Sequence, residues 1–171
     1  MHRTVLVAAM LCACALAAGA QKESVTLNGV TFDFGGPAPP LTRLEQEFAR
    51  SYIKAINKHD AESLLGLRDI SYSNCADYGI RVLLRDLQQA EIPANAKLRF
   101  FTSNTDFATL LRAEDLVYMP VQNTAIFGIS FESATKENGR YVNILRPVRE
   151  TAETITIVPY CLTDKGKSLP H

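Results

Sequence analysis

Few residues in this 171-residue chain have the type and spacing that nucleophilic, metal or phosphate chemistry requires. No G-x-S-x-G, P-loop or G-x-G-x-x-G pattern occurs, so the sequence offers no motif of a serine hydrolase or a nucleotide-binding protein. His2 and His171 lie at the two ends of the chain, and only His59 lies well inside it. No histidine and cysteine cluster has the spacing of a zinc site. We therefore expect no metal and no cofactor, and we interpret His59 as an exposed turn residue.

Two cysteines could form a structural disulfide. Cys75 and Cys161 are the cysteines outside the first 20 residues, and an even pair in an oxidising compartment predicts a disulfide. Cys161 has the strand parity of Ile157, so both side chains would face the same side of a sheet. Cys75 directly precedes an expected helix that must pack on that face. Two buried free thiols are the alternative.

The first 20 residues are typical of a secretion signal. Arg3 provides a basic start, an apolar run follows, and residues 18–20 form a small-residue cleavage site. The apolar run is shorter than the roughly 20 residues that a membrane span needs. Residues 11–14 loosely resemble a lipobox, which would make Cys14 a lipid-bearing residue instead. In either case we expect an exported protein, periplasmic or secreted.

The rest of the chain is long enough for one domain with its own core. We expect a short ribbon and a Gly/Pro linker over residues 21–40, one domain over residues 41–162, and a flexible tail over residues 163–171. The precursor has 18 basic and 18 acidic residues. This balance gives no basic surface for nucleic acid or an anionic membrane, so neither is an expected partner.

The domain is organised around a helix pair at residues 42–67. Thr42 and Glu45 form a capping-box pattern, and apolar residues then recur at four-residue spacing. The first helix is expected to end near His59, and Asp60 is placed to cap the second helix. The first helix has one broad apolar face, which a sheet must cover.

The remaining pattern supplies that sheet. Residues 24–34 alternate around Asn28-Gly29, which predicts a hairpin, and residues 76–91 have helical spacing. Strands are expected at residues 97–103, 117–119, 125–132, 141–146 and 154–161, with a helical turn at 106–113. Three helices followed by a largely antiparallel sheet is an α+β order.

The segment SYIKAINKHDAESLLGL resembles the opening helices of the nuclear transport factor 2-like superfamily. This superfamily includes ketosteroid isomerases and SnoaL-type polyketide cyclases. The resemblance covers the helices well and the strands only in pattern. It implies a curved, cone-like sheet packed under the N-terminal helices. It also allows a homodimer, because members often pair through the open sheet face.

The resemblance further implies a cavity inside the cone. Enzymes of the superfamily use an Asp or His base there, with tyrosine or acid groups that hold an oxyanion. The residues of this chain that could line such a cavity are Tyr52, Asp69, Tyr72, Tyr78 and Tyr118. None of them matches a catalytic motif of the family, and Tyr52 as a core residue with Asp69 as a capping carboxylate is the simpler interpretation. The cavity residues alone therefore do not identify an enzyme.

Three functions stay open from the sequence. The first is a non-catalytic domain that binds a small apolar molecule or a protein partner. The second is an isomerase, dehydratase or cyclase that uses a carboxylate in the cavity. The third is a purely structural or inhibitory partner protein. A buried carboxylate in an apolar cavity would favour the second.

Overall fold

The computed structural model describes residues 23–27, 30–70, 76–89, 91–102, 116–117, 124–133, 141–158 and 161–162. The expected signal segment, the Asn28-Gly29 turn, the helical turn at 106–113 and the tail at 163–171 lie outside these residues. The elements are β1 (Ser24–Leu27), β2 (Val30–Asp33), α1 (Arg43–Asn57), α2 (Ala61–Gly66), α3 (Ala76–Leu84), the 3₁₀ turn η2 (Arg85–Gln88), β3 (Lys97–Thr102), β4 (Leu116–Val117), β5 (Thr124–Glu132), β6 (Tyr141–Glu150), β7 (Ile155–Ile157) and β8 (Cys161–Leu162).

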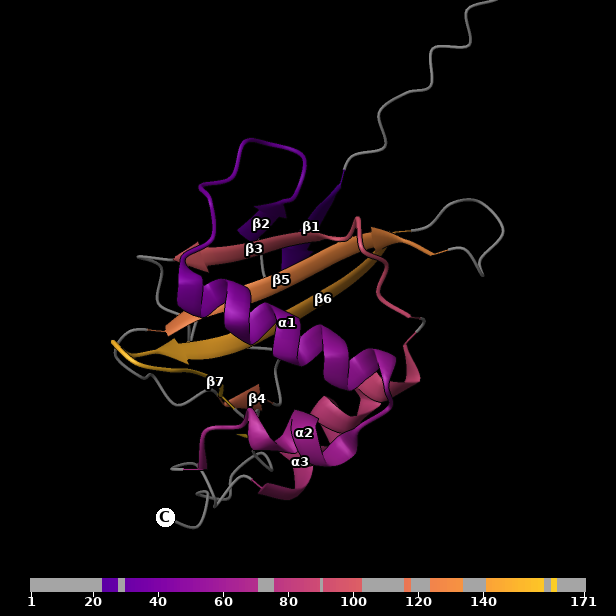
Figure 1. Ribbon diagram of the computed structural model, residues 1–171, viewed down its shortest axis with the longest axis vertical. Coiled ribbons are helices and arrows are strands. Elements are labelled where there is room, and N and C mark those ends of the chain that lie inside the picture. The colour runs from indigo at the N-terminus through magenta and orange to yellow at the C-terminus, as the bar shows by residue number, and fades with distance from the viewer. Residues whose placement is uncertain are drawn as a thin grey trace, which may run out of the picture.

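The fold is α+β, as the sequence predicts. Strands β3, β5, β6 and β7 form an open antiparallel sheet in that order, and α1 runs across one face of it (Figure 1). Two smaller two-stranded sheets pair β1 with β2 and β4 with β8. No helix in the described ranges is both long enough and apolar enough to cross a membrane.

The caps of the first two helices form as expected. The Thr42 hydroxyl accepts a hydrogen bond from the Glu45 amide at 3.2 Å, and the Glu45 carboxylate accepts one from the Thr42 amide at 2.6 Å. Asp60 caps α2 by accepting from the Ser63 amide at 3.0 Å. Between the helices, His59 is exposed and has a φ of 52°, the left-handed conformation that turns the chain. His59 is therefore a turn residue, as we interpret it from the sequence.

The core lies between α1 and the inner face of the sheet. Phe48, Tyr52 and Ile56 of α1 meet Phe127 of β5 and Val148 of β6, all nearly or fully buried. Alternate residues of β5 face α1, and the strand is buried on both faces over residues 125–131. The apolar face that the sequence predicts for the first helix is therefore the face that the sheet covers.

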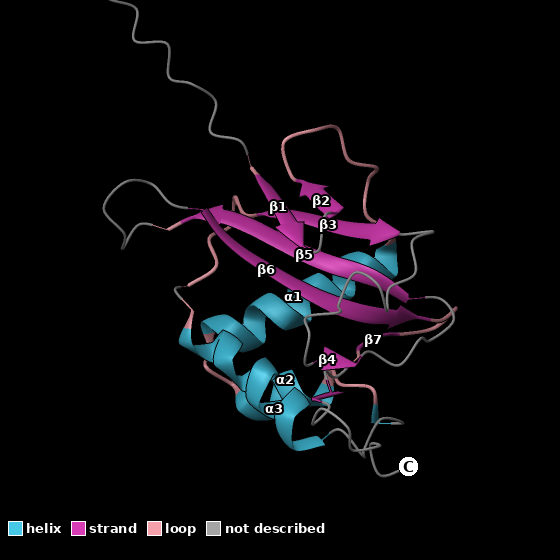
Figure 2. Cartoon of the chain, turned by 180° about the vertical axis from the view of Figure 1, so that it is seen from behind, coloured by secondary structure: helices cyan, strands magenta, loops and turns pink. Residues whose placement is uncertain are grey.

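The β1–β2 hairpin packs on the opposite face of the sheet, as the view from behind shows (Figure 2). Phe34 meets the ring of Phe101 edge-on at 5.5 Å between centroids. Gly128 makes room for this contact, because a Cβ there would lie 2.8 Å from ring atoms of both Phe34 and Phe101. The face that the resemblance expects to be open for dimerisation thus carries the hairpin.

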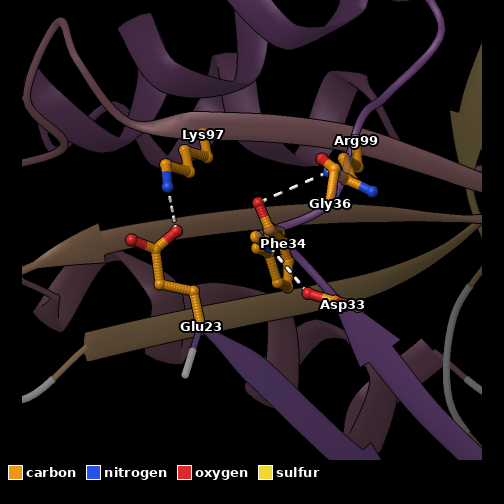
Figure 3. A network of polar contacts seen from close by, with 7 residues as sticks. Glu23, Asp33, Phe34, Gly36, Lys97 and Arg99 are labelled. Atoms are coloured by element: carbon orange, nitrogen blue, oxygen red, sulfur yellow. Dashed lines mark hydrogen bonds and ion pairs between the residues drawn. The ribbon is translucent and has the colours of Figure 1, made fainter. Parts of the chain in front are cut away.

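Polar contacts hold the open end of the hairpin, where Glu23 precedes β1 and Gly36 lies after β2 (Figure 3). Lys97 forms an ion pair with Glu23, and its hydrogen bond lowers the pKa of Glu23. Arg99 donates to the carbonyl of Gly36. Both basic residues belong to β3, so this edge strand holds the N-terminal segment in place.

Two elements differ from the prediction. The third helix tightens into η2 after Leu84 instead of continuing to residue 91. The last expected strand is not continuous: β7 ends at Ile157, and Cys161 belongs to β8, which pairs with β4 outside the main sheet. A shared strand parity of Cys161 with Ile157 therefore no longer follows. The disulfide itself stays a prediction, because Cys75 and the Cys161 side chain lie outside what the structure describes.

Candidate functional site

A buried carboxylate that the sequence analysis did not select lies at the centre of the domain. Asp86 of η2 has only 2% of its surface exposed. In a 3₁₀ turn, residues three apart lie on the same side, which places Asp86 on the inward face with Leu83. The carboxylate therefore points into the interior between α1 and β6.

Three donors occupy the Asp86 carboxylate. Arg146 of β6 donates from Nε to Oδ2 at 2.7 Å and from Nη2 to Oδ1. The hydroxyl of Tyr52, on α1, also donates to Oδ2. The elements α1, η2 and β6 are thus joined by one bidentate ion pair and one phenol hydrogen bond.

Tyr52 is fully buried and stays protonated. Its ring lies edge-on to Phe127 at 5.5 Å, and burial raises the pKa of its phenol well above the usual value, with the negative charge of Asp86 adding to the rise. The positive charge of Arg146 acts in the opposite direction. A neutral phenol is the form that can donate to a carboxylate. Tyr52 therefore acts as a hydrogen-bond donor in the folded protein.

This arrangement is suited to holding the fold rather than to moving protons. A general base must direct a free lone pair at a substrate proton. Both oxygens of Asp86 already accept charge-assisted hydrogen bonds, and Arg146 balances its charge. The buried group that would have favoured an enzyme is therefore present, but it is engaged in an internal ion pair.

Asp69, the other expected site carboxylate, has different partners. It is buried, and its Oδ2 lies 3.3 Å from Nη1 of Arg149. Along β6, Arg149 has the opposite parity to Arg146, so the two arginines leave opposite faces of the strand. The structure thus brings Tyr52 to Asp86 and not to Asp69. Tyr72 and Tyr118 lie outside the described residues, and Tyr78 is described only as backbone within α3.

A small cavity lies next to the Asp86–Arg146 pair. Its volume is about 10 Å³, room for one water-sized group. Its walls are Gly79, Val82 and Leu83 of α3, Ile157 and Val158 at the end of β7, and the side chains of Arg68 and Arg146. The surface of the cavity is almost entirely apolar, so the two arginines line it mainly with the carbon atoms of their side chains. We call it the Arg68 cavity.

Backbone pairing fixes Arg68 at this cavity. The residue forms a parallel bridge with Ile157. The amide of Ile157 donates to Leu67 O at 2.7 Å, and the amide of Asp69 donates to Ile157 O at 2.8 Å. Hydrogen bonds on both sides of Arg68 thus hold its backbone against β7. Within the described chain, its Nε and Nη1 atoms are buried and have no hydrogen-bond partner.

A second, larger hollow lies on the surface near the linker. It has a volume of about 250 Å³ and is lined by the linker residues 38–41, by Glu45, and by Arg99, Phe100 and Phe101 of β3. Both charged residues already have partners, since Glu45 completes the helix cap and Arg99 donates to Gly36 O. This hollow therefore presents mainly apolar side chains.

Part of this site had a signal in the sequence. Asp86 lies three residues after Leu83 on the apolar side of the helical pattern, and Arg146 interrupts the inward series of Val142, Ile144 and Val148. Residues of opposite charge at inward positions of two different elements indicate an internal ion pair. Arg68 had no such signal, because the burial of its Nε and Nη1 atoms depends on the pairing with β7.

The described residues contain no group of three or more histidine, cysteine or acidic side chains that could hold a metal ion. Comparison with known proteins adds no relative: no family model matches the chain, and no curated protein or solved structure matches it either.

Proposed function

We propose that this protein is an exported, non-catalytic domain that binds a small, largely apolar molecule through the Arg68 cavity. Its fold class and the order of its helices are compatible with the nuclear transport factor 2-like superfamily, to which we assign it as part of the same proposal. A scaffold of this kind hosts unrelated functions, so the site has to carry the argument.

The observation that carries the proposal is the state of Asp86. An isomerase or cyclase of this type needs a carboxylate free to remove a proton from its substrate. Asp86 is engaged by Tyr52 and by both sides of a bidentate contact with Arg146. Opening this cluster for catalysis would leave a buried charge without a partner, which costs several kcal/mol. Binding at the neighbouring cavity requires no such opening.

The cavity also has the composition expected of a binding site. Small-molecule sites are mostly apolar and contain a few fixed polar groups. Five of the seven residues that line this one are apolar or glycine, and the other two are arginines. Only a small part of a ligand fits inside, so the remainder would extend outward along α3 and β7.

A nuclear magnetic resonance experiment in D₂O separates binding from catalysis. The purified protein is titrated with short-chain ketones, carboxylic acids, amides and alcohols, and both its amide shifts and the deuterium content of each compound are recorded. We expect shift changes in α3 and β7 without deuterium incorporation next to a carbonyl. Protein-dependent deuteration would show an acid–base enzyme, and the absence of any shift change would contradict the binding proposal.

Two variants of α3 provide the matched control. Val82→Phe places a larger side chain in the cavity wall, and we expect it to abolish the shift changes. Leu84 lies two residues further on and does not line the cavity, so Leu84→Phe should retain them. Equal loss of binding in both variants would indicate a general disturbance of α3.

Export is the part of the proposal that depends on the sequence alone. The signal-like composition of residues 1–20 supports it. Intact-mass measurement of the exported protein should give a chain that begins at Gln21. A lipid-modified chain that begins at Cys14 would support the lipoprotein alternative instead.

A further inference from the structure

The surface hollow beside the linker is large enough for a small molecule, and we call it the linker hollow. The linker passes the end of β3 on its way from β2 to the start of α1 (Figure 1), and residues 38–41 line the hollow from that side. Its volume of about 250 Å³ is just below the range of about 300–1,000 Å³ that is usual for drug-sized ligands. A ligand of this hollow would therefore be smaller than a typical drug.

Prolines keep the linker apart from β3. Pro39 and Pro40 have no backbone N–H, so they cannot donate to the strand as a neighbouring β-strand would. Within the described chain, no backbone hydrogen bond joins residues 38–41 to β3. The rings of both prolines and of Phe100 and Phe101 line the space between linker and strand. These walls provide contact for a hydrocarbon group.

The linker hollow also contains one acidic and one basic side chain. Glu45 of α1 and Arg99 of β3 both line it, and the ion pairs of the described residues include neither of them. Glu45 is oriented by the Thr42 amide, which donates to its Oε2 at 2.6 Å. Arg99 is oriented by the carbonyl of Gly36, to which its Nη2 donates (Figure 3). Two opposite charges are thus held around the same space without pairing to each other.

Both charged groups keep hydrogen-bonding atoms in reserve. A carboxylate can accept several hydrogen bonds, and a guanidinium can donate several. In the described chain, Oε1 of Glu45 and the Nε and Nη1 atoms of Arg99 have no partner. The negative charge of Glu45 is felt at Glu150 of β6, whose pKa is raised by burial and, in addition, by this charge. The Glu45 side of the hollow therefore favours a positive group, and the Arg99 side favours a negative one.

We propose that the linker hollow binds a free α-amino acid with an apolar side chain. The ammonium group contacts Glu45, the carboxylate contacts Arg99, and the side chain packs against the proline and phenylalanine rings. A molecule with a single charge would use only one of the two charged groups. This site is separate from the Arg68 cavity, so the inference goes beyond the proposed function and does not depend on it.

The test is a titration of the purified protein at pH 7 and constant ionic strength, followed by its amide signals in nuclear magnetic resonance. The probes are leucine, isoamylamine and isocaproate, which share one hydrocarbon group and carry both charges, only the positive charge and only the negative charge, respectively. We expect leucine to shift the amide signals of Ala38, Leu41 and Phe100 in a saturable way. Each single-charge analogue should bind at least about tenfold more weakly, the loss expected when charge-assisted hydrogen bonds are removed.

Variants of the two charged residues locate the effect. Glu45→Gln removes the charge but keeps a side chain that can complete the helix cap, and it should weaken leucine binding by about tenfold. Glu47→Gln, which removes an exposed charge of the same helix, is the matched control and should bind normally. Arg99→Lys keeps the charge and a donor for Gly36 but loses the planar fork of donors, so it should also bind more weakly.

A second pair of variants tests the hollow itself without touching the charges. Ala38 is an exposed linker residue, so Ala38→Phe should fill the hollow and abolish leucine binding while Tm stays close to that of the parent. Ala94 is also exposed and does not line the hollow, so Ala94→Phe should bind normally.

The outcomes distinguish this inference from the proposed function. If either single-charge analogue binds as tightly as leucine, one charge is sufficient and the amino-acid inference is wrong. Equal affinity of Glu45→Gln and Glu47→Gln for leucine would also overturn it. Leucine shifts confined to α3 and β7 would support binding at the Arg68 cavity and contradict this site. Shifts confined to the linker and β3 would support this site, whatever the Arg68 cavity binds.

Discussion

Removal of the Asp86 carboxylate should destabilise the protein more than any surface substitution. Asp86→Leu removes the negative charge that Asp86 supplies to the Arg146 guanidinium, whose side chain is only 14% exposed. Breaking a buried pair from one side typically costs about 3–5 kcal/mol. Tyr52 also loses its hydrogen-bond acceptor inside the core. We therefore expect a loss at the upper end of this range, measured as the free energy of unfolding in urea.

A double-mutant cycle separates the ion pair from general damage to the core. Arg146→Met alone should also cost about 3–5 kcal/mol, because it leaves Asp86 charged and buried. The double variant removes both charges, so it should lose clearly less than the sum of the single losses, by about 0.5–3 kcal/mol. Glu47→Gln breaks only the exposed pair with Arg43 and should change stability by less than about 1 kcal/mol. Strict additivity of the two core substitutions would refute the reasoning.

Three further predictions follow from single contacts. Tyr52→Phe should cost about 1.5–3 kcal/mol at pH 7. Because folding raises the pKa of Tyr52, the free energy of unfolding should fall as the pH rises above about 10, the ordinary pKa of tyrosine. This fall should be steeper in the parent protein than in Tyr52→Phe. Parallel pH profiles of the two proteins in urea unfolding would contradict the reasoning. Gly128→Ala should lower the free energy of unfolding in urea by about 1–3 kcal/mol, because the new Cβ crowds the rings of Phe34 and Phe101. Gly66→Ala is the control and should not destabilise, because no atom lies within 4 Å of its new Cβ. Equal losses in both variants would contradict the close packing above Gly128. A disulfide between Cys75 and Cys161 is favoured by the contact of α3 with β8. If it forms, the denatured, unreduced protein should have no thiol that reacts with a thiol reagent. Two reactive thiols per mature chain would exclude the disulfide.

Local signals explain why the helices could be predicted. The Thr42–Glu45 cap and the Asp60 cap depend on residues three positions apart, so the sequence contains both partners of each contact. The inward face of α1 follows from a four-residue repeat. These features need no knowledge of the rest of the fold.

Features that depend on distant pairing could not be predicted in the same way. The apolar pattern of residues 154–161 is compatible with one strand, but the chain leaves the main sheet after Ile157 and Cys161 pairs with Val117 of β4. The hairpin position depends on the space above Gly128, which a sequence pattern does not reveal. The strand parity used to orient Cys161 was therefore unsound.

The candidate site shows the same division. Tyr52 was named as a residue that could line a cavity, with a core position as the simpler interpretation, and in the structure it is fully buried in the core. Its partner Asp86 is 34 residues away along the chain and Arg146 lies a further 60 residues beyond Asp86. The Nε and Nη1 atoms of Arg68 become buried because the bridge to Ile157 holds the residue against β7. A single sequence contains the charges but not the distances that pair them.

A crystal structure of the protein with a compound that shifts the amide signals of α3 and β7 tests the central claim most directly. The account predicts that one end of the compound lies in the cavity between α3 and β7, with Asp86 still bound to Arg146 and Tyr52. A ligand that contacts Asp86 directly, with Arg146 or Tyr52 displaced, would contradict a non-catalytic site. A compound bound away from this cavity would contradict the proposed binding site.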